Sequence, residues 1–241
     1  NELLFNPKTG GNDFVELYNR STKYIDLKNW KVANLKDSKK ISANPFILKP
    51  NEFAAFTVNK SLLLNYYPQG NESSIYQLPS LPPYNDDEGT VILLDSNDIE
   101  QERFEYSENM HFELMDDKEG VSLERILDSE SSLISSNWHS ASSTAGYATP
   151  GYRNSQSKRT TIGTSFWIEP KVFTPDQNGI NDFTLLHYKL NQSGLMANIT
   201  IYDYSGREIL KLVQNELVST EGFYKWEGID KNKERVRSGI Y

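Results

Sequence analysis

Four oxygen-bearing side chains within seven residues are the clearest candidates for chemistry in this 241-residue sequence. They are Asp176, Asn178, Asn181 and Asp182, with Gly179 at the bend of the segment. Ca²⁺ takes about six to eight oxygen ligands in a flexible cage, which loops rich in Asp and Asn supply. The same side chains also cap turns by accepting hydrogen bonds from nearby backbone N–H groups. No Glu follows at EF-hand spacing, so turn capping is favoured; we expect no cofactor, with calcium as the one candidate.

Aromatic residues are a second group with binding chemistry, at 12% of the chain. Four tyrosines fall in expected loops or at the end of an expected helix: Tyr66, Tyr67, Tyr76 and Tyr84. Exposed rings at such positions stack on sugars or anchor a protein partner. The alternative is that these rings cover the ends of a β-structure, and this alternative is favoured.

Groups for catalysis are few. The chain has no cysteine and only three histidines, His111, His139 and His187. Although His139 precedes Ser140, no serine lies in a Gly-x-Ser-x-Gly elbow, and no His-Glu-x-x-His motif or phosphate-binding glycine loop is present. His187 lies in an alternating run typical of a strand. Paired carboxylates as in glycoside hydrolases remain open at this point, but we expect the chain not to be an enzyme.

The charge of the chain argues against nucleic acid as a partner. The net charge is −8, and residues 1–162 hold 16 basic and 23 acidic side chains. Nucleic-acid binders gain affinity from a basic footprint that displaces counterions. The one basic cluster, residues 36–40, is interpreted as a solvated turn. No apolar run approaches the roughly 18 residues of a transmembrane helix. No basic-then-apolar segment opens the sequence, so we expect any signal peptide to have been removed or to lie outside it.

Short strands separated by turn residues account for most of the sequence. The run Phe14–Asn19 alternates as a half-buried strand does. Similar runs occur at 24–27, 30–33, 46–48, 53–58, 90–95, 102–106 and 121–126. One short helix is predicted over Asn59–Tyr67, which begins with capping residues and stops at Pro68. This pattern predicts an all-β sandwich or barrel.

The polar segment around residue 155 divides the chain. Residues 154–161 are almost free of core residues, follow a Thr-Pro-Gly turn and precede the apolar run Phe166–Ile168. Such a change in composition is typical of an interdomain linker. We therefore predict domains at 1–154 and 166–241, joined by a linker over 155–165. Within the first domain, Glu16 and Arg125 each interrupt an apolar run and are predicted to form a partly buried ion pair.

Motifs in the first half occur in a recognisable order. They are Glu16-Leu17-Tyr18-Asn19, Asp26-Leu27 with Trp30, Ser122-Leu123-Glu124-Arg125, Asn137-Trp138 and Thr149-Pro150-Gly151-Tyr152-Arg153-Asn154. Together they resemble the lamin tail domain as it occurs in secreted bacterial proteins, over residues 1–154. The resemblance implies an immunoglobulin-like β-sandwich.

The second half resembles a different family. Its motifs are Val172–Phe183, Ile199–Arg207, Tyr224–Gly228 and Ser238–Tyr241. They are similar to FlgD-like immunoglobulin domains and to the gliding-motility-associated C-terminal domains on surface proteins of Bacteroidetes. The second version implies export by the type IX secretion machinery, with this domain as the sorting and attachment signal. The fold expected for the whole chain is therefore two immunoglobulin-like β-sandwiches joined by a short polar linker.

The function expected from these features is that of a non-catalytic, secreted or cell-surface module. It would bind a surface protein or a glycan, or display neighbouring domains. The alternative is an accessory, non-catalytic part of a larger secreted hydrolase or nuclease.

Overall fold

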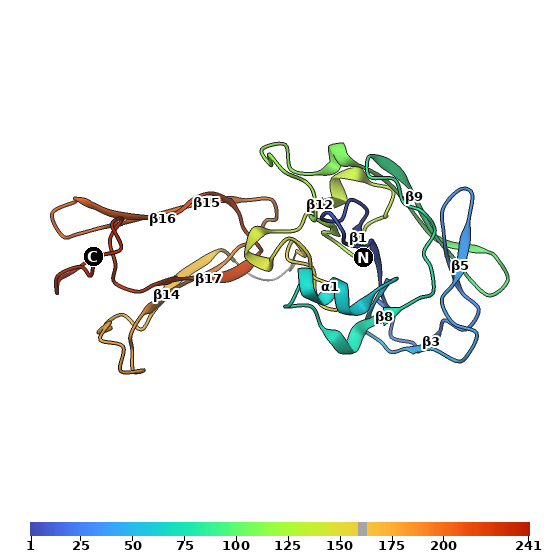
Figure 1. The fold of residues 1–241 in the computed structure, drawn as a ribbon, viewed down its shortest axis with the longest axis horizontal. Helices are drawn as coiled ribbons and strands as arrows, with labels where there is room; N and C mark the ends of the chain where they lie inside the picture. Colours follow the sequence, from blue (N-terminus) through green and yellow to red (C-terminus); the bar gives the residue numbers. More distant parts are fainter. Residues whose placement is uncertain (159–162) are drawn as a thin grey trace. The chain divides into compact units, whose positions relative to one another are not determined.

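Two compact units make up the chain in the computed structural model, which describes residues 1–158 and 163–241. Unit 1 comprises Asn1–Ser157 and unit 2 comprises Lys158–Tyr241. Figure 1 shows that both consist largely of strands. The prediction of an all-β chain is confirmed.

Unit 1 is a sandwich of two antiparallel-dominated sheets. The larger sheet has the order β12-β11-β1-β2-β7-β8, with the bounds β12 Trp138–Ser140, β11 Leu123–Arg125, β1 Glu2–Leu4, β2 Phe14–Tyr18, β7 Phe53–Thr57 and β8 Ile75–Gln77. The smaller has the order β10-β9-β4-β5, with β10 Glu100–Ser107, β9 Glu88–Leu94, β4 Lys31–Ala33 and β5 Ser38–Lys40. A separate pair joins β3 Ile25–Asp26 and β6 Ile47–Leu48. The basic segment predicted as a turn thus ends in strand β5.

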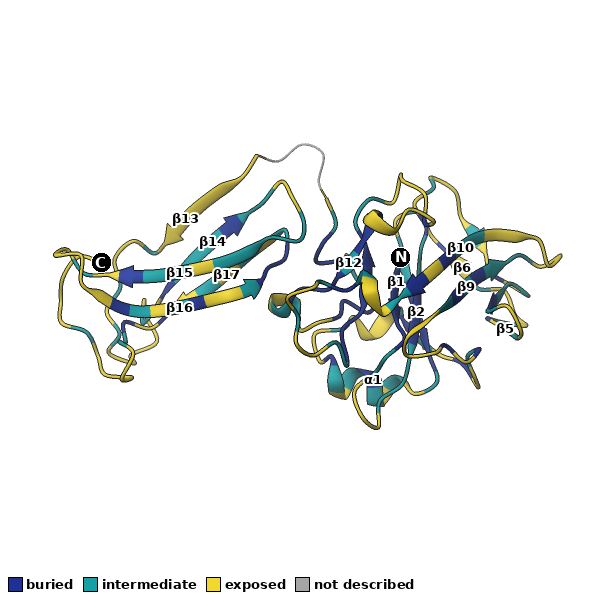
Figure 2. Ribbon diagram, turned by 90° about the horizontal axis from the view of Figure 1, so that it is seen from above, coloured by how far each residue is buried: buried dark blue, intermediate teal, exposed yellow. Residues whose placement is uncertain are grey.

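The six-stranded sheet is covered on both faces. Side chains alternate across a strand, so Leu3 and Val15 face the core between the two sheets while Leu4 and Phe14 belong to a second core on the other side. Figure 2 shows the resulting dark-blue centre of unit 1. The prediction of a half-buried strand at residues 14–19 was wrong, because Phe14, Val15 and Glu16 are all buried.

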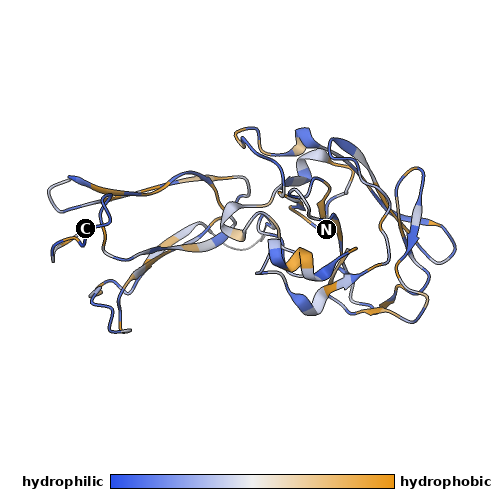
Figure 3. Ribbon diagram, viewed as in Figure 1, coloured by the Kyte–Doolittle hydropathy of each residue, from blue (hydrophilic) through white to orange (hydrophobic). Residues whose placement is uncertain are grey.

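Helix α1, Lys60–Tyr66, covers the outer side of this sheet and confirms the predicted helix. The Asn59 side chain caps it by accepting a hydrogen bond from the Leu62 N–H. Figure 3 shows its apolar middle, where the buried Leu63 packs in the second core. Four short 3-10 segments are the other helices described: Glu72–Ser74, Glu108–Met110, Ser135–Asn137 and Ser143–Ala145. None of the helices in the described residues is long and apolar enough to cross a membrane.

The segment predicted as the start of the linker belongs to unit 1. Ser155 and Gln156 are buried, at 8% and 0% exposure, and both hydrogen-bond to the Glu124 carboxylate. Their polarity misled the prediction, because they provide hydrogen bonds to a buried charge rather than contact with solvent. Residues 159–162 of the predicted linker lie outside the described residues.

Unit 2 is a smaller sandwich of two sheets. One has the order β13-β14-β17, with β13 Ser165–Glu169, β14 Thr184–Lys189 and β17 Glu221–Trp226. The other pairs β15 Met196–Tyr202 with β16 Glu208–Leu217. Ile201, Ile209 and Trp226 form the buried core, with Leu186 packed against it. The core therefore lies between the two sheets, and the opposite face of the three-stranded sheet is not part of it.

Candidate functional site

Three glutamates lie in a row across the centre of unit 1. Glu2 in β1 is directly opposite Glu16 in β2 and Glu124 in β11. All three point to the same face of the sheet, and each is at most 1% exposed. Buried groups with mutually perturbed titration mark many active sites, so this row requires an explanation.

Donors from the end of unit 1 surround the three carboxyl groups. Glu2 accepts hydrogen bonds from the Thr149 N–H (2.7 Å) and from the Ser122 hydroxyl. Glu16 accepts from the Gly151 N–H at 2.6 Å. Glu124 accepts from the Ser155 hydroxyl at 2.7 Å and from the Gln156 N–H at 2.8 Å. Residues 149–156 thus replace the water that these carboxyl groups lose on folding.

The hydroxyl of Thr149 fixes the position of one proton. Its Oγ1 lies 2.9 Å from Glu2 Oε2 and 2.7 Å from Glu124 Oε1. A threonine hydroxyl has one hydrogen and therefore donates only one of these two bonds. The other contact becomes a full hydrogen bond only when a carboxyl group carries a proton, and we infer that Glu2 and Glu124 together hold one shared proton beside Thr149.

The titration of the row agrees with this arrangement. Burial, followed by repulsion from Glu124, raises the pKa of Glu2 well above its ordinary value of 4.5. Burial also raises the pKa of Glu124 and that of Glu16, the latter to about 8. Desolvation penalises the charged form of each carboxyl group, and neighbouring like charges add to this penalty.

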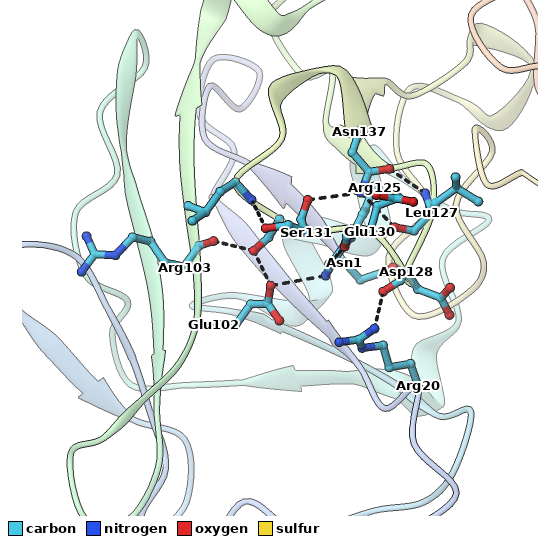
Figure 4. Close-up of polar contacts among 12 residues, drawn as sticks. Asn1, Arg20, Glu102, Arg103, Arg125, Leu127, Asp128, Glu130, Ser131 and Asn137 are labelled. Carbon is cyan, nitrogen blue, oxygen red and sulfur yellow. Dashed lines mark hydrogen bonds and ion pairs between the residues drawn. The ribbon is translucent and has the colours of Figure 1, made fainter.

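The row closes the fold and is not accessible to a substrate. Its donors are backbone N–H groups, small hydroxyls and the side-chain amide of Asn1, and none of the three carboxyl groups reaches solvent. The predicted pair of Glu16 with Arg125 is wrong. The register aligns Glu16 with Glu124, so Arg125, one residue further, faces the other side of the sheet and pairs with Glu102 at 3.6 Å (Figure 4).

A row of exposed rings lies on the outward face of the three-stranded sheet of unit 2. Trp167 in β13 is opposite His187 in β14, and His187 is opposite Phe223 in β17. Trp167 is 39% exposed and Phe223 is 58% exposed. We call these three residues the aromatic row. Figure 2 shows β13, which carries Trp167, exposed along its whole length.

The rings of the aromatic row pack against one another. The Trp167 and His187 rings are stacked, with centroids 4.9 Å apart and an interplanar angle of 5°. Phe223 follows at 5.7 Å from His187, tilted by 53°. Leu186, next to His187, and Trp226, three residues after Phe223, face the core instead. Because side chains alternate between the two faces of the sheet, one face packs in the core and the other carries the aromatic rings toward solvent.

Charged groups border the aromatic row at both ends. Lys189 and Glu221 form an ion pair at 3.7 Å beside it. At the other end Lys225 lies 4.5 Å from the centre of the Phe183 ring and pairs with Glu227. The site therefore combines exposed aromatic side chains with flanking hydrogen-bond donors and acceptors.

The tyrosines predicted as binding residues have structural roles. Tyr67 and Tyr84 are 2% and 6% exposed, so the prediction was wrong for them. Tyr67 donates a hydrogen bond to the Gly120 carbonyl at 2.8 Å. Tyr66 donates to the Thr9 carbonyl at 2.9 Å, and Tyr76 packs edge-on against Phe46. The segments that carry these rings fold over the sheets, which sequence position alone did not indicate.

The predicted calcium loop has turn-capping geometry. Asp182 accepts hydrogen bonds from the N–H groups of Gln177 (2.6 Å) and Gly179 (2.7 Å). Asn178 accepts from the Ile180 N–H at 2.7 Å, and Asp176 accepts from Asn178. Asn181 has a positive φ of 52°. Within residues 1–158 and 163–241, no three His, Asp or Glu side chains are grouped to hold a metal ion, and calcium binding remains a prediction.

The histidines of unit 1 do not form a hydrolytic site. His139 contacts the carbonyl of Ser140, at 3.1 Å, rather than its hydroxyl. His111 Nδ1 lies 3.0 Å from Ser140 Oγ, and burial lowers the pKa of His111 to about 4. Ser140 is completely buried and His111 is 3% exposed. This contact is part of the core.

Comparison with known proteins gives a family match for part of the chain. The family model described as Lamin Tail Domain matches residues 1–108, so the resemblance noted in the first half is confirmed for this part of the chain. The match ends before β11 and β12, although both strands complete the same sheet. No curated protein matches the chain. An immunoglobulin-like lamin tail domain suggests a non-catalytic module.

Glu16 is expected to make unit 1 less stable as the pH rises from about 4.5 to about 8. In this window the folded state keeps the Glu16 proton, up to a pKa of about 8, while the unfolded chain has released it. The contribution of this group to the free energy of unfolding therefore falls as the pH rises. His111 acts in the opposite direction, because burial lowers its pKa to about 4. We therefore expect the melting temperature of unit 1, followed by the NMR signals of Trp138, to fall between pH 5 and pH 8 by about 5 °C more in wild type than in Glu16→Gln, which keeps His111 but lacks the proton. An equal pH dependence in the two proteins would contradict the assignment.

Glu124→Gln tests the shared proton. Glutamine offers an amide N–H toward Thr149 and an oxygen toward Gln156, so the variant should keep the wild-type melting temperature at pH 8 or exceed it. Thr149→Val removes the hydroxyl between two carboxyl groups and should cost about 2 kcal/mol. Urea unfolding of both variants measures the difference. Loss of stability in Glu124→Gln equal to that in Thr149→Val would show that both carboxyl groups are ionised.

Proposed function

We propose that this chain is a non-catalytic, exported module that binds a glycan through the aromatic row of unit 2. Unit 1 acts as a rigid neighbouring domain, and the second half acts as a sorting and attachment domain of the FlgD-like or type IX kind. The chain is thus a surface module, or an accessory part of a larger secreted hydrolase or nuclease.

The observation that carries the binding proposal is the aromatic row itself. Single exposed hydrophobic residues are normal on protein surfaces, whereas contiguous ones mark interaction sites. The apolar C–H face of a pyranose ring packs on a flat aromatic ring, whose electron-rich face attracts the weakly positive hydrogens. The face of the Trp167 ring that is turned away from His187, on the edge strand β13, offers such a surface, and the Lys189–Glu221 pair beside the row supplies groups that can hydrogen-bond sugar hydroxyls.

Export and sorting rest on the resemblance of the second half and on composition. The Val172–Phe183 and Ser238–Tyr241 motifs support the sorting role, and the absence of cysteine is compatible with export. Attachment to type IX machinery is tested by fusing residues 163–241 to a secreted reporter in a gliding bacterium and measuring the reporter on the cell surface. A reporter that remains in the periplasm contradicts the sorting role and leaves the binding proposal unaffected.

A protein partner is the second candidate, and strand β13 favours it. All five residues of β13 are exposed, and the strand lies at the edge of its sheet. Edge strands accept an added strand from a partner through backbone hydrogen bonds. Such pairing depends on the backbone of β13 and much less on the rings of Trp167 and Phe223.

A glycan array covering neutral sugars, amino sugars and peptidoglycan fragments tests the proposal on the full chain. Wild type is expected to bind, and Trp167→Ala and Phe223→Ala are expected to raise the dissociation constant about tenfold or more, equivalent to roughly 1.4 kcal/mol. Phe166→Ala is the matched control, because Phe166 is 72% exposed on the same strand but alternates to the other side of the sheet.

The variants distinguish the two candidates. Equal loss in Phe166→Ala, or no binding by wild type, overturns the aromatic row as a glycan site. Capture of a surface protein that survives Trp167→Ala and Phe223→Ala but is lost in Ile168→Pro supports strand addition at β13. Unchanged melting temperatures in the two alanine variants show that the fold of unit 2 is intact.

A further inference from the structure

Charged side chains border the aromatic row on the outward face of the three-stranded sheet of unit 2. The strand register places three lines of side chains on this face, each running across β13, β14 and β17. The aromatic row is the middle line. The lines on either side of it contain Ser165, Lys189 and Glu221, and Glu169, Leu185 and Lys225. Two acids and two bases therefore lie beside the rings.

Ion pairs occupy three of these four charged side chains. Lys189 in β14 pairs with Glu221 in β17 at 3.7 Å. Lys225 pairs with Glu227. The β17 side of the face is therefore close to electrically neutral.

Glu169 at the end of β13 has no such partner. Its neighbour across the strand pair is Leu185, which carries no charge. All five residues of β13 are exposed, and across residues 1–158 and 163–241 the Glu169 side chain forms neither an ion pair nor a hydrogen bond. The β13 side of the face therefore carries an unpaired negative charge.

Trp167 lies beside this carboxylate. It precedes Glu169 by two residues on the same face of the strand, so their Cα atoms are about 7 Å apart. One face of its ring stacks on His187, and the other is turned away from His187 at the edge strand of the sheet. The face of an indole ring attracts cations, and a carboxylate next to it adds to this attraction. The chemistry of this corner therefore favours a ligand with a positive charge.

We propose that the glycan bound at the aromatic row contains amino sugars with free, protonated amines. The C–H face of such a sugar packs on the free face of Trp167, and its ammonium group pairs with the Glu169 carboxylate. Acetylation of the amine removes the charge and leaves stacking alone, and an acidic sugar is repelled by Glu169. The preference depends on the proposed function, glycan binding at the aromatic row, and specifies the class of sugar.

Three β-1,4-linked trisaccharides that differ only at C2 of each sugar test this preference on the full chain. The glucosamine trimer carries ammonium groups, the N-acetylglucosamine trimer carries neutral amides, and cellotriose carries hydroxyl groups. Calorimetric titration in a mildly acidic, low-salt buffer keeps the amines protonated. The glucosamine trimer should bind about tenfold more tightly than the other two, because an exposed ion pair and a cation over an indole ring each raise affinity a few-fold. The preference should shrink in high salt, which screens exposed charges.

Two substitutions assign the preference to one carboxylate. Glu169→Gln removes the charge and keeps the shape, so it should weaken binding of the glucosamine trimer about fivefold and bring it close to that of cellotriose. Glu208→Gln is the matched control, because it removes the same charge from an exposed position in β16, on the other sheet of unit 2. It should leave the preference unchanged. The melting temperatures of both variants check the fold.

The results separate this preference from glycan binding itself. Equal binding of the three trisaccharides, lost in Trp167→Ala, overturns the preference for amino sugars and supports the glycan site. Equal loss in Glu169→Gln and Glu208→Gln attributes the preference to net charge and overturns the role of Glu169. Tighter binding of trilysine than of the glucosamine trimer contradicts a sugar as the ligand. If wild type binds neither these trisaccharides nor any glycan of the array, both proposals fail.

Discussion

The burial of three carboxyl groups side by side is the constraint on which unit 1 depends. Glu2, Glu16 and Glu124 occupy neighbouring positions on three adjacent strands, where like charges would ordinarily destabilise a sheet. The arrangement is tolerated because residues 149–156 bring backbone N–H groups and hydroxyls to the carboxyl oxygens. Both faces of the central sheet are thereby removed from water. The first unit consequently extends to Ser157, well beyond the part that matches the Lamin Tail Domain family.

Unit 2 differs from unit 1 in that one face of its three-stranded sheet is left uncovered. Its three-stranded sheet has a partner on one side only, so strict alternation leaves every second side chain outward. Polar residues would be expected there, yet Trp167, His187 and Phe223 stand in register across all three strands. The glycan proposed for the aromatic row would cover these rings and remove them from water.

Local patterns were enough to predict most elements and some of the core. The strand at Phe14–Tyr18, the helix cap at Asn59 and the burial of Trp138 could each be predicted from a few neighbouring residues. The glutamate row could not be predicted, because it depends on the pairing of Glu2 with a residue more than a hundred positions away. The tyrosines failed for a related reason: Tyr67 and Tyr84 lie in segments that fold back over the sheets. For the aromatic row, the alternation in Thr184–Lys189 predicts that the strand has two different faces. Which face is exposed depends on the position of β15 and β16, and the sequence pattern does not indicate it.

The pairing of β1 with β11 also has a consequence for the order in which the polypeptide acquires its structure. The amino-terminal strand lies between β2 and β11, and its glutamate is satisfied only by residues beyond position 148. During synthesis, a nascent chain that has not yet emerged to Gln156 exposes three unsatisfied carboxyl groups on an incomplete sheet. Contacts of such long sequence separation slow folding, since loop closure must precede them. Unit 1 is therefore a domain that assembles late, after the segment that ends at Gln156 has left the ribosome.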